Sequence, residues 1–171
     1  MLVPLALPQL TAEAGAILHG VVTDVRSDWN PSRTHIFTFV TVQVDRYLKG
    51  HLGSTVTLME FGGEAGGMRQ FIPGVPQFTP GQEVVLFLSV KPPMYPAVLA
   101  LSQGQFSVVR GTNGEKMLTR SFYGASLVGR GDPFNRPLSL SAFETQVSQL
   151  VHPPADGKNI AGLDARRRRK P

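Results

Sequence analysis

The chain has 171 residues, of which 42% are hydrophobic and 17% charged, as expected for one folded domain. It contains no cysteine, which excludes disulfides, thiolate catalysis and cysteine-ligated zinc. No apolar run approaches the roughly 20 residues that a membrane-spanning helix requires.

The net charge of +5 is concentrated at the C-terminus. Residues 1–152 contain eleven basic and ten acidic residues, whereas residues 153–171 contain six basic and two acidic ones. We expect residues 153–171 to form a disordered basic tail. Such a tail either makes weak electrostatic contact with nucleic acid or an anionic surface, or is solvated without a fixed partner. Its charge comes chiefly from one run: Arg166, Arg167, Arg168, Arg169 and Lys170.

Residues 1–15 have two interpretations. The apolar stretch and the Ala12-Glu13-Ala14 triplet are typical of a remnant of an export signal, but no basic segment precedes them and prolines interrupt them. The alternative is an extended lead-in to the first strand.

Alternating side chains predict the first strands. Residues 16–25 form one candidate strand, and residues 27–33 have the composition of a turn. Residues 34–50 (THIFTFVTVQVDRYLKG) alternate over an unusual length, which predicts a long strand that bends or coils. The alternation places Val40 and Val42 on one face and leaves aromatic side chains on the other.

Four further strands are expected along the chain. Residues 54–61 alternate between apolar and polar side chains, and the almost wholly apolar residues 83–90 predict a strand covered on both faces. Residues 97–110 form another candidate strand with a bend at Gly104. The Asn113-Gly114 turn leads to a short strand near residues 116–122.

One amphipathic helix ends this region. Ser141 and Glu144 have the spacing of a capping box, and Pro153 terminates the helix. A short helix is marginal alone, so its apolar stripe must dock on the sheet. The stripe consists of Phe143, Val147, Leu150 and Val151.

These elements predict a mainly β fold. Five to six antiparallel strands in succession, a long second strand and one C-terminal helix favour a small OB-like β-barrel over residues 16–152. A β-sandwich is the second architecture compatible with the pattern.

The short motifs and turn residues in and between the predicted strands resemble those of a family of uncharacterised bacterial exported proteins. The shared features over residues 10–152 include Gly20–Ser27 (GVVTDVRS), Leu48–Gly50, Pro76–Leu88 (PQFTPGQEVVLFL) and Ser102–Phe106 (SQGQF). The resemblance implies an extracytoplasmic (periplasmic or secreted) OB-like barrel, reminiscent in layout of netrin and metalloproteinase-inhibitor domains. It implies no catalytic residues or cofactor.

The segment 62–81 (GGEAGGMRQFIPGVPQFTPG) is the candidate contact surface. A loop of this length is usually functional, and its apolar residues argue against a solvated linker. We expect partner contacts through Met68, Arg69, Phe71 and Phe78. Alternatively, part of the segment is a β-hairpin or a plug packed on the sheet.

The function predicted from these features is a non-enzymatic, exported binding module with an unidentified protein or surface partner and without metal or cofactor. One alternative is an OB domain that binds single-stranded nucleic acid, which would require arginines to converge with Phe37 and Phe39. Another is a hydrolase, which would require a pocket holding Glu60 or Glu64 beside a histidine. The aromatics of residues 34–50 are expected to pack beneath the C-terminal helix.

Overall fold

A computed structural model describes residues 1–129, 131–134 and 136–154. The predicted basic tail from residue 155 onward, including Arg166 to Lys170, lies outside the described residues. The fold is mainly β, with 42% strand and 15% helix. Among the described residues, the helical segments are α1 (Leu7–Glu13), the 3-10 turn η1 (Leu101–Gly104) and α2 (Leu140–Val151). The strands are β1 (Ala16–Trp29), β2 (Ile36–Lys49), β3 (Thr55–Phe61), β4 (Gly63–Ala65), β5 (Met68–Gln70), β6 (Glu83–Ser89), β7 (Ala97–Val98), β8 (Gln105–Arg110), β9 (Lys116–Thr119) and β10 (Leu138–Ser139).

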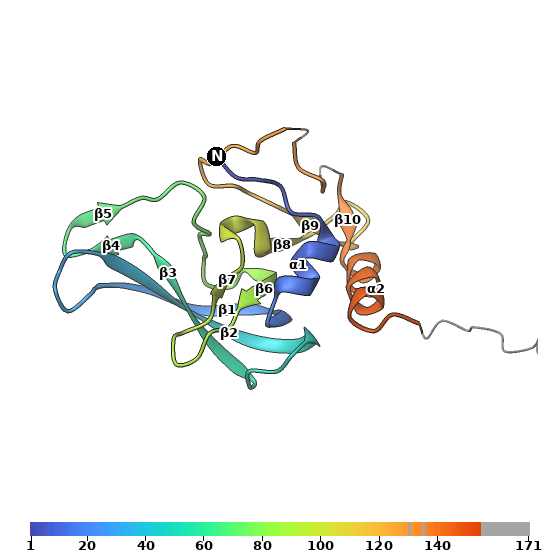
Figure 1. Cartoon of the computed structure of the whole chain (residues 1–171), viewed down its shortest axis with the longest axis horizontal. Helices are drawn as coiled ribbons and strands as arrows, with labels where there is room; N and C mark the ends of the chain where they lie inside the picture. The colour runs from blue at the N-terminus through green and yellow to red at the C-terminus, as the bar shows by residue number, and fades with distance from the viewer. Residues whose placement is uncertain (130, 135, 155–171) are drawn as a thin grey trace, which may run out of the picture.

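One antiparallel sheet forms most of the molecule. Its strand order is β10-β9-β8-β6-β1-β2-β3, and β7 also pairs with β6 (Figure 1). The antiparallel fold class is therefore confirmed. The sheet is not closed into a barrel, so the barrel remains unconfirmed. Strand β3 approaches the start of β7, where the Met59 amide donates a hydrogen bond to the carbonyl of Pro96, the residue before β7, at 3.0 Å.

The sheet has an apolar core on each face. Strand β6 contributes to both, because Val84, Leu86 and Leu88 point to one face while Val85 and Phe87 point to the other. All five side chains are fully buried, which confirms the prediction that this strand is covered on both faces. One core fills the inside of the curved β1–β2–β3 meander, and the other lies under the helices.

The long strand β2 follows its predicted alternation. Val40 and Val42 are fully buried in the inner core, while Phe37 and Phe39 emerge on the outer face. Phe37 stacks on Phe61 with ring centroids 4.9 Å apart, and Phe39 meets Tyr95 edge-on at 5.5 Å. The expectation that these aromatics pack beneath the C-terminal helix is therefore wrong, because the helices cover the other end of the sheet (Figure 1).

Helix α2 docks through part of its predicted apolar stripe. Phe143 and Val147 are fully buried, and Phe143 contacts Phe87 and Phe106. Val151 is partly buried against the same core, whereas the prediction is wrong for Leu150, which is 41% exposed. The predicted cap is wrong by two residues: the Ser139 hydroxyl accepts from the Ala142 amide at 3.2 Å.

Glu144 turns to the sheet instead of closing a capping box. Its Oε2 lies 3.0 Å from Arg46 Nη2, and its Oε1 lies 3.3 Å from Nδ1 of the buried His19. His19 Nε2 in turn lies 2.8 Å from Glu83. Partial burial would raise the pKa of Glu83, but the hydrogen bonds and charges of Lys116 and His19 together lower it.

Two local expectations differ from the structure. Residues 7–13 form helix α1, with Leu10 fully buried in the core next to α2, where an extended lead-in was one of two expectations. Residues 97–110 do not form one strand, because Ala100 and Leu101 adopt positive φ angles of 53° and 58° that an extended strand cannot contain. The chain instead forms β7, η1 and β8, with the bend ending at Gly104 as predicted.

Candidate functional site

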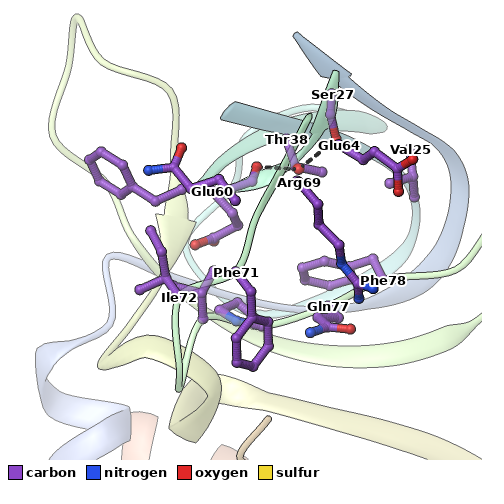
Figure 2. A pocket seen from close by; sticks show the side chains of 16 residues that line it. Val25, Ser27, Thr38, Glu60, Glu64, Arg69, Phe71, Ile72, Gln77 and Phe78 are labelled. Atoms are coloured by element: carbon purple, nitrogen blue, oxygen red, sulfur yellow. Dashed lines mark hydrogen bonds between the residues drawn. The ribbon is translucent and has the colours of Figure 1, made fainter. Parts of the chain in front are cut away.

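The inner face of the β1–β2–β3 meander is apolar and ends in a row of polar side chains, called here the polar row. Antiparallel pairing places Ser27, Thr38 and Glu60 side by side, one row beyond Val25, Val40 and Leu58. Ser27 Oγ lies 2.8 Å from Thr38 Oγ1, and the Thr38 hydroxyl donates to the Gly62 carbonyl at 2.7 Å (Figure 2). The interior of the curved sheet therefore changes from hydrocarbon to hydrogen-bonding groups at this end.

The segment 62–81 folds over this polar row. Its first part is the β4–β5 hairpin, so the absence of regular structure expected there is corrected in favour of the hairpin alternative. Hydrogen bonds fix the hairpin to β2: the Ile36 amide donates to Gln70 Oε1 at 2.8 Å, and the Gly62 amide donates to the Ile36 carbonyl at 2.7 Å. The segment is therefore held in place by the sheet that it covers.

Gly63 allows the hairpin to approach the sheet. Its φ angle is 126°, and a Cβ atom at this position would collide with Ser27 Oγ and Thr38 Oγ1. Only glycine combines this backbone angle with so small a volume.

A cavity of about 410 Å³ remains between the polar row and the segment 62–81. This volume lies within the usual range for ligand pockets, which are mainly apolar with a few placed polar groups. The hydrocarbon and aromatic part of its wall consists of Val25, Phe61, Phe71, Ile72, Val75, Pro76 and Phe78. The polar part consists of Ser27, Thr38, Glu60, Glu64, Arg69, Gln70 and Gln77, with Gly62 and Gly63 between them.

Glu60 is the buried ionisable group of this cavity. Only 5% of the residue is exposed, and Oε1 accepts from the Val98 amide at 2.6 Å. Burial raises the pKa of Glu60 to about 7, although the hydrogen bond from Val98 acts in the opposite direction. Glu64, the other carboxylate named for the hydrolase alternative, is exposed, whereas Glu60 is buried.

The predicted contact residues occupy different parts of this region. Arg69, Phe71 and Phe78 line the cavity, and Figure 2 shows the Arg69 side chain extending toward Phe78 and Gln77. Phe71 is 52% exposed, so it also forms part of the outer surface. Met68 is 59% exposed on the hairpin and does not line the cavity.

The geometry required by the hydrolase alternative is not found in this cavity. Glu60 and Glu64 both line it, but its lining contains no histidine. His19 lies under α2, where it contacts Glu83 and Glu144. In the part of the chain that the structure describes, no three His, Asp or Glu side chains form a candidate metal site.

The arginines required by the nucleic-acid alternative do not converge. Arg26 lies over Phe39, with its guanidinium carbon 5.6 Å from the ring centroid. Arg46 pairs with Glu144, and the buried Arg120 pairs with Asp132 at 2.8 Å.

The inward orientation of Glu60 can be predicted from the sequence. Glu60 continues the inward-facing series Val56 and Leu58, so alternation alone places its carboxyl in the interior. The cover provided by residues 62–81 has no such local signal, because it depends on contacts between distant segments.

Comparison with protein-family models and with curated proteins found no match to this chain. Among the described residues, no helix is both long enough and apolar enough to cross a membrane.

Proposed function

We propose that this protein is a non-enzymatic binding module that contacts a protein partner through the segment 62–81. The observation that carries the proposal is the cavity beneath this segment, bordered by exposed apolar side chains. Phe71 is more than half exposed while also lining the cavity, and Met68 adds an exposed thioether on the hairpin. Exposed aromatic and methionine side chains around a hollow are typical of interaction sites.

Preorganisation supports the same proposal. The hydrogen bonds from Ile36 to Gln70 and from Gly62 to Ile36 hold the hairpin before any partner arrives. A fixed segment loses less conformational entropy on binding than a mobile one. The family resemblance adds two parts to this proposal, an OB-like barrel layout and an extracytoplasmic location. The approach of β3 to β7 at Met59 and Pro96 is compatible with the barrel layout.

A peptide selection tests the proposed contact surface. Random peptides displayed on phage are selected on the full chain and then assayed on the double variant Met68→Ser/Phe71→Ser. The matched control is Met94→Ser/Tyr95→Ser, because these residues form a second exposed Met–aromatic pair outside the segment. We expect enriched peptides that lose at least tenfold in affinity on the first variant only. Equal binding to both variants would refute segment 62–81 as the contact surface.

The aromatic outer face of β2 and β3 favours a second candidate function, the binding of single-stranded nucleic acid. Phe37, Phe39 and Phe61 are available there for base stacking, with Arg26 over Phe39. For this function, Phe39→Ala in a chain ending at His152 must weaken binding of oligothymidine, by about 1–3 kcal/mol for one stacked base. An unchanged affinity excludes stacking on this face.

A further inference from the structure

One oxygen of the Glu60 carboxyl group, Oε2, has no hydrogen-bond donor among the described residues. Its Oε1 accepts from Val98, but among the described residues no hydrogen bond reaches Oε2 and no cationic group lies within ion-pair distance. Arg69 lines the same cavity but extends toward Phe78 and Gln77 (Figure 2). A buried carboxylate without a cationic partner is unfavourable.

Two events relieve this cost. The first is protonation, and burial accordingly raises the pKa of Glu60 to about 7. The second is the arrival of a cation that donates hydrogen bonds to the carboxylate. Near neutral pH the carboxyl group is divided between both protonation states, so it is available to a cationic ligand.

The neighbouring polar groups also favour a hydrogen-bond donor. The Thr38 hydroxyl donates to the Gly62 carbonyl, so the hydrogen bond between Ser27 and Thr38 must use the Ser27 hydrogen. Ser27 Oγ therefore keeps lone pairs and no free hydrogen. On β1, two strands away from Glu60, the floor of the cavity therefore offers a further acceptor.

The apolar wall of the cavity indicates that the cation carries an apolar group. Phe71, Ile72 and Phe78 line the cavity from the segment 62–81, facing the polar row. A small hydrated cation would leave this hydrocarbon surface unmatched. A cation on an aliphatic stem satisfies both parts of the cavity.

We propose that the cavity binds the alkylammonium group of a lysine side chain of the partner, with the Glu60 carboxylate as counter-ion. This rests on the proposed function, since the partner that contacts segment 62–81 carries the lysine. Phe71, Ile72 and Phe78 surround the aliphatic stem. Glu64 is exposed at the rim and does not hold the ammonium group.

The first test uses n-pentylammonium as the probe and 1-pentanol as its neutral analogue. Binding to the full chain in phosphate buffer is followed by NMR through the amide signals of Gly62, Gly63 and Val98. We expect saturable shifts with n-pentylammonium alone, and an affinity about tenfold higher at pH 8 than at pH 6, because only ionised Glu60 binds. Equal binding of 1-pentanol, a pH-independent affinity or an absence of shifts would overturn the proposal.

Variants locate the ammonium site. Glu60→Gln keeps an acceptor for Val98 but removes the charge, and it is expected to abolish binding at both pH values. Glu13→Gln, which removes an exposed carboxylate on α1 outside the cavity lining, is the matched control and is expected to bind as the wild type does. If Glu60→Gln binds equally, the assignment is wrong. The pH dependence of the wild type remains decisive if this variant does not fold.

The source of the ammonium group is tested with the capped peptide Gly-Lys-Gly and its Nε-acetyllysine counterpart. Binding of the first peptide only supports a lysine of the partner. Binding of n-pentylammonium without binding of the lysine peptide overturns this source in favour of a small free amine. Selected phage peptides that need Met68 and Phe71 but contain no lysine overturn this inference while leaving the proposed function intact.

Discussion

Glu60 combines a structural role with the binding role proposed for it. Its carboxyl group ends the inward series of β3, and it accepts from the Val98 amide where β3 meets β7. The side chain thus supplies a hydrogen bond at a point where the sheet does not close. The same position exposes its second oxygen to the cavity and raises its pKa to about 7.

The raised pKa of Glu60 makes stability depend on pH. A folded-state pKa above the unfolded value of 4.5 means that the stabilisation is complete below pH 4.5 and is lost as pH rises to about 7. We expect the wild type to lose about 3 kcal/mol of unfolding free energy over this interval from Glu60 alone. In Glu60→Gln this contribution disappears, so the variant is expected not to lose this free energy between pH 4.5 and pH 8.

Urea denaturation of the two proteins at pH 4.5 and pH 8 measures this difference. Glu64→Gln serves as the control, because Glu64 is exposed. If Glu60→Gln and the wild type show the same dependence on pH, Glu60 has no raised pKa.

Gly63 provides a second prediction at the residue scale. Gly63→Ala is expected to destabilise the protein by about 1–3 kcal/mol, because the methyl group meets the Ser27 and Thr38 hydroxyl groups at a positive φ. Gly67→Ala is the matched control, since its φ is also positive but no atom lies within 4 Å of the added Cβ. Thermal unfolding measures the effect. If both substitutions lower the melting temperature equally, backbone strain explains the loss and close packing at Gly63 does not.

At the scale of elements, the two ends of the sheet are covered by different elements. Helices α1 and α2 cover one end, where Phe87, Phe106 and Phe143 form an aromatic cluster. The β4–β5 hairpin covers the other end of the meander, over the polar row (Figure 1). The proposed contact site therefore lies where the sheet is lined by polar groups, away from the aromatic cluster.

Docking of α2 depends on Phe143. Phe143→Asp places a charge in the centre of the aromatic cluster, so we expect the helix to undock and the protein to lose at least 3–5 kcal/mol, about the cost of deleting a buried Phe. Gln146→Asp, on the exposed face of the same helix, controls for helix propensity. An unchanged melting temperature in Phe143→Asp would contradict this packing.

At the scale of the whole molecule, charge and folded structure are separated along the chain. Residues 1–152 have eleven basic and ten acidic residues, so a sequence-independent attraction to nucleic acid would come from residues 153–171. We expect the full chain to bind labelled single-stranded DNA weakly at 50 mM salt and to lose this binding at 200 mM salt. A chain ending at His152 is expected not to bind at either salt concentration.

Fluorescence anisotropy of the two chains makes this comparison. Micromolar or tighter binding that persists after truncation would establish that the folded region itself binds nucleic acid. It would favour the aromatic face of β2 and β3 over the segment 62–81.

The sequence by itself determined the elements whose signal is local and periodic. The alternation of residues 34–50 predicted β2 and its buried valines, and the apolar residues 83–90 predicted a strand covered on both faces. The stripe through Phe143 and Val147 predicted α2. In each case the burial pattern repeats with the geometry of the element, so neighbouring residues carry enough information.

Only the tertiary structure decided the features that depend on distant partners. Helix α1 is short and gains its stability from packing on α2 and the core, which a local pattern of residues 7–13 does not show. The same holds for the cavity: pairing of β1, β2 and β3 brings Ser27, Thr38 and Glu60 into one row, and residues 62–81 then cover it. Burial of Glu60 follows from this cover, because long-range contacts remove the carboxyl group from water.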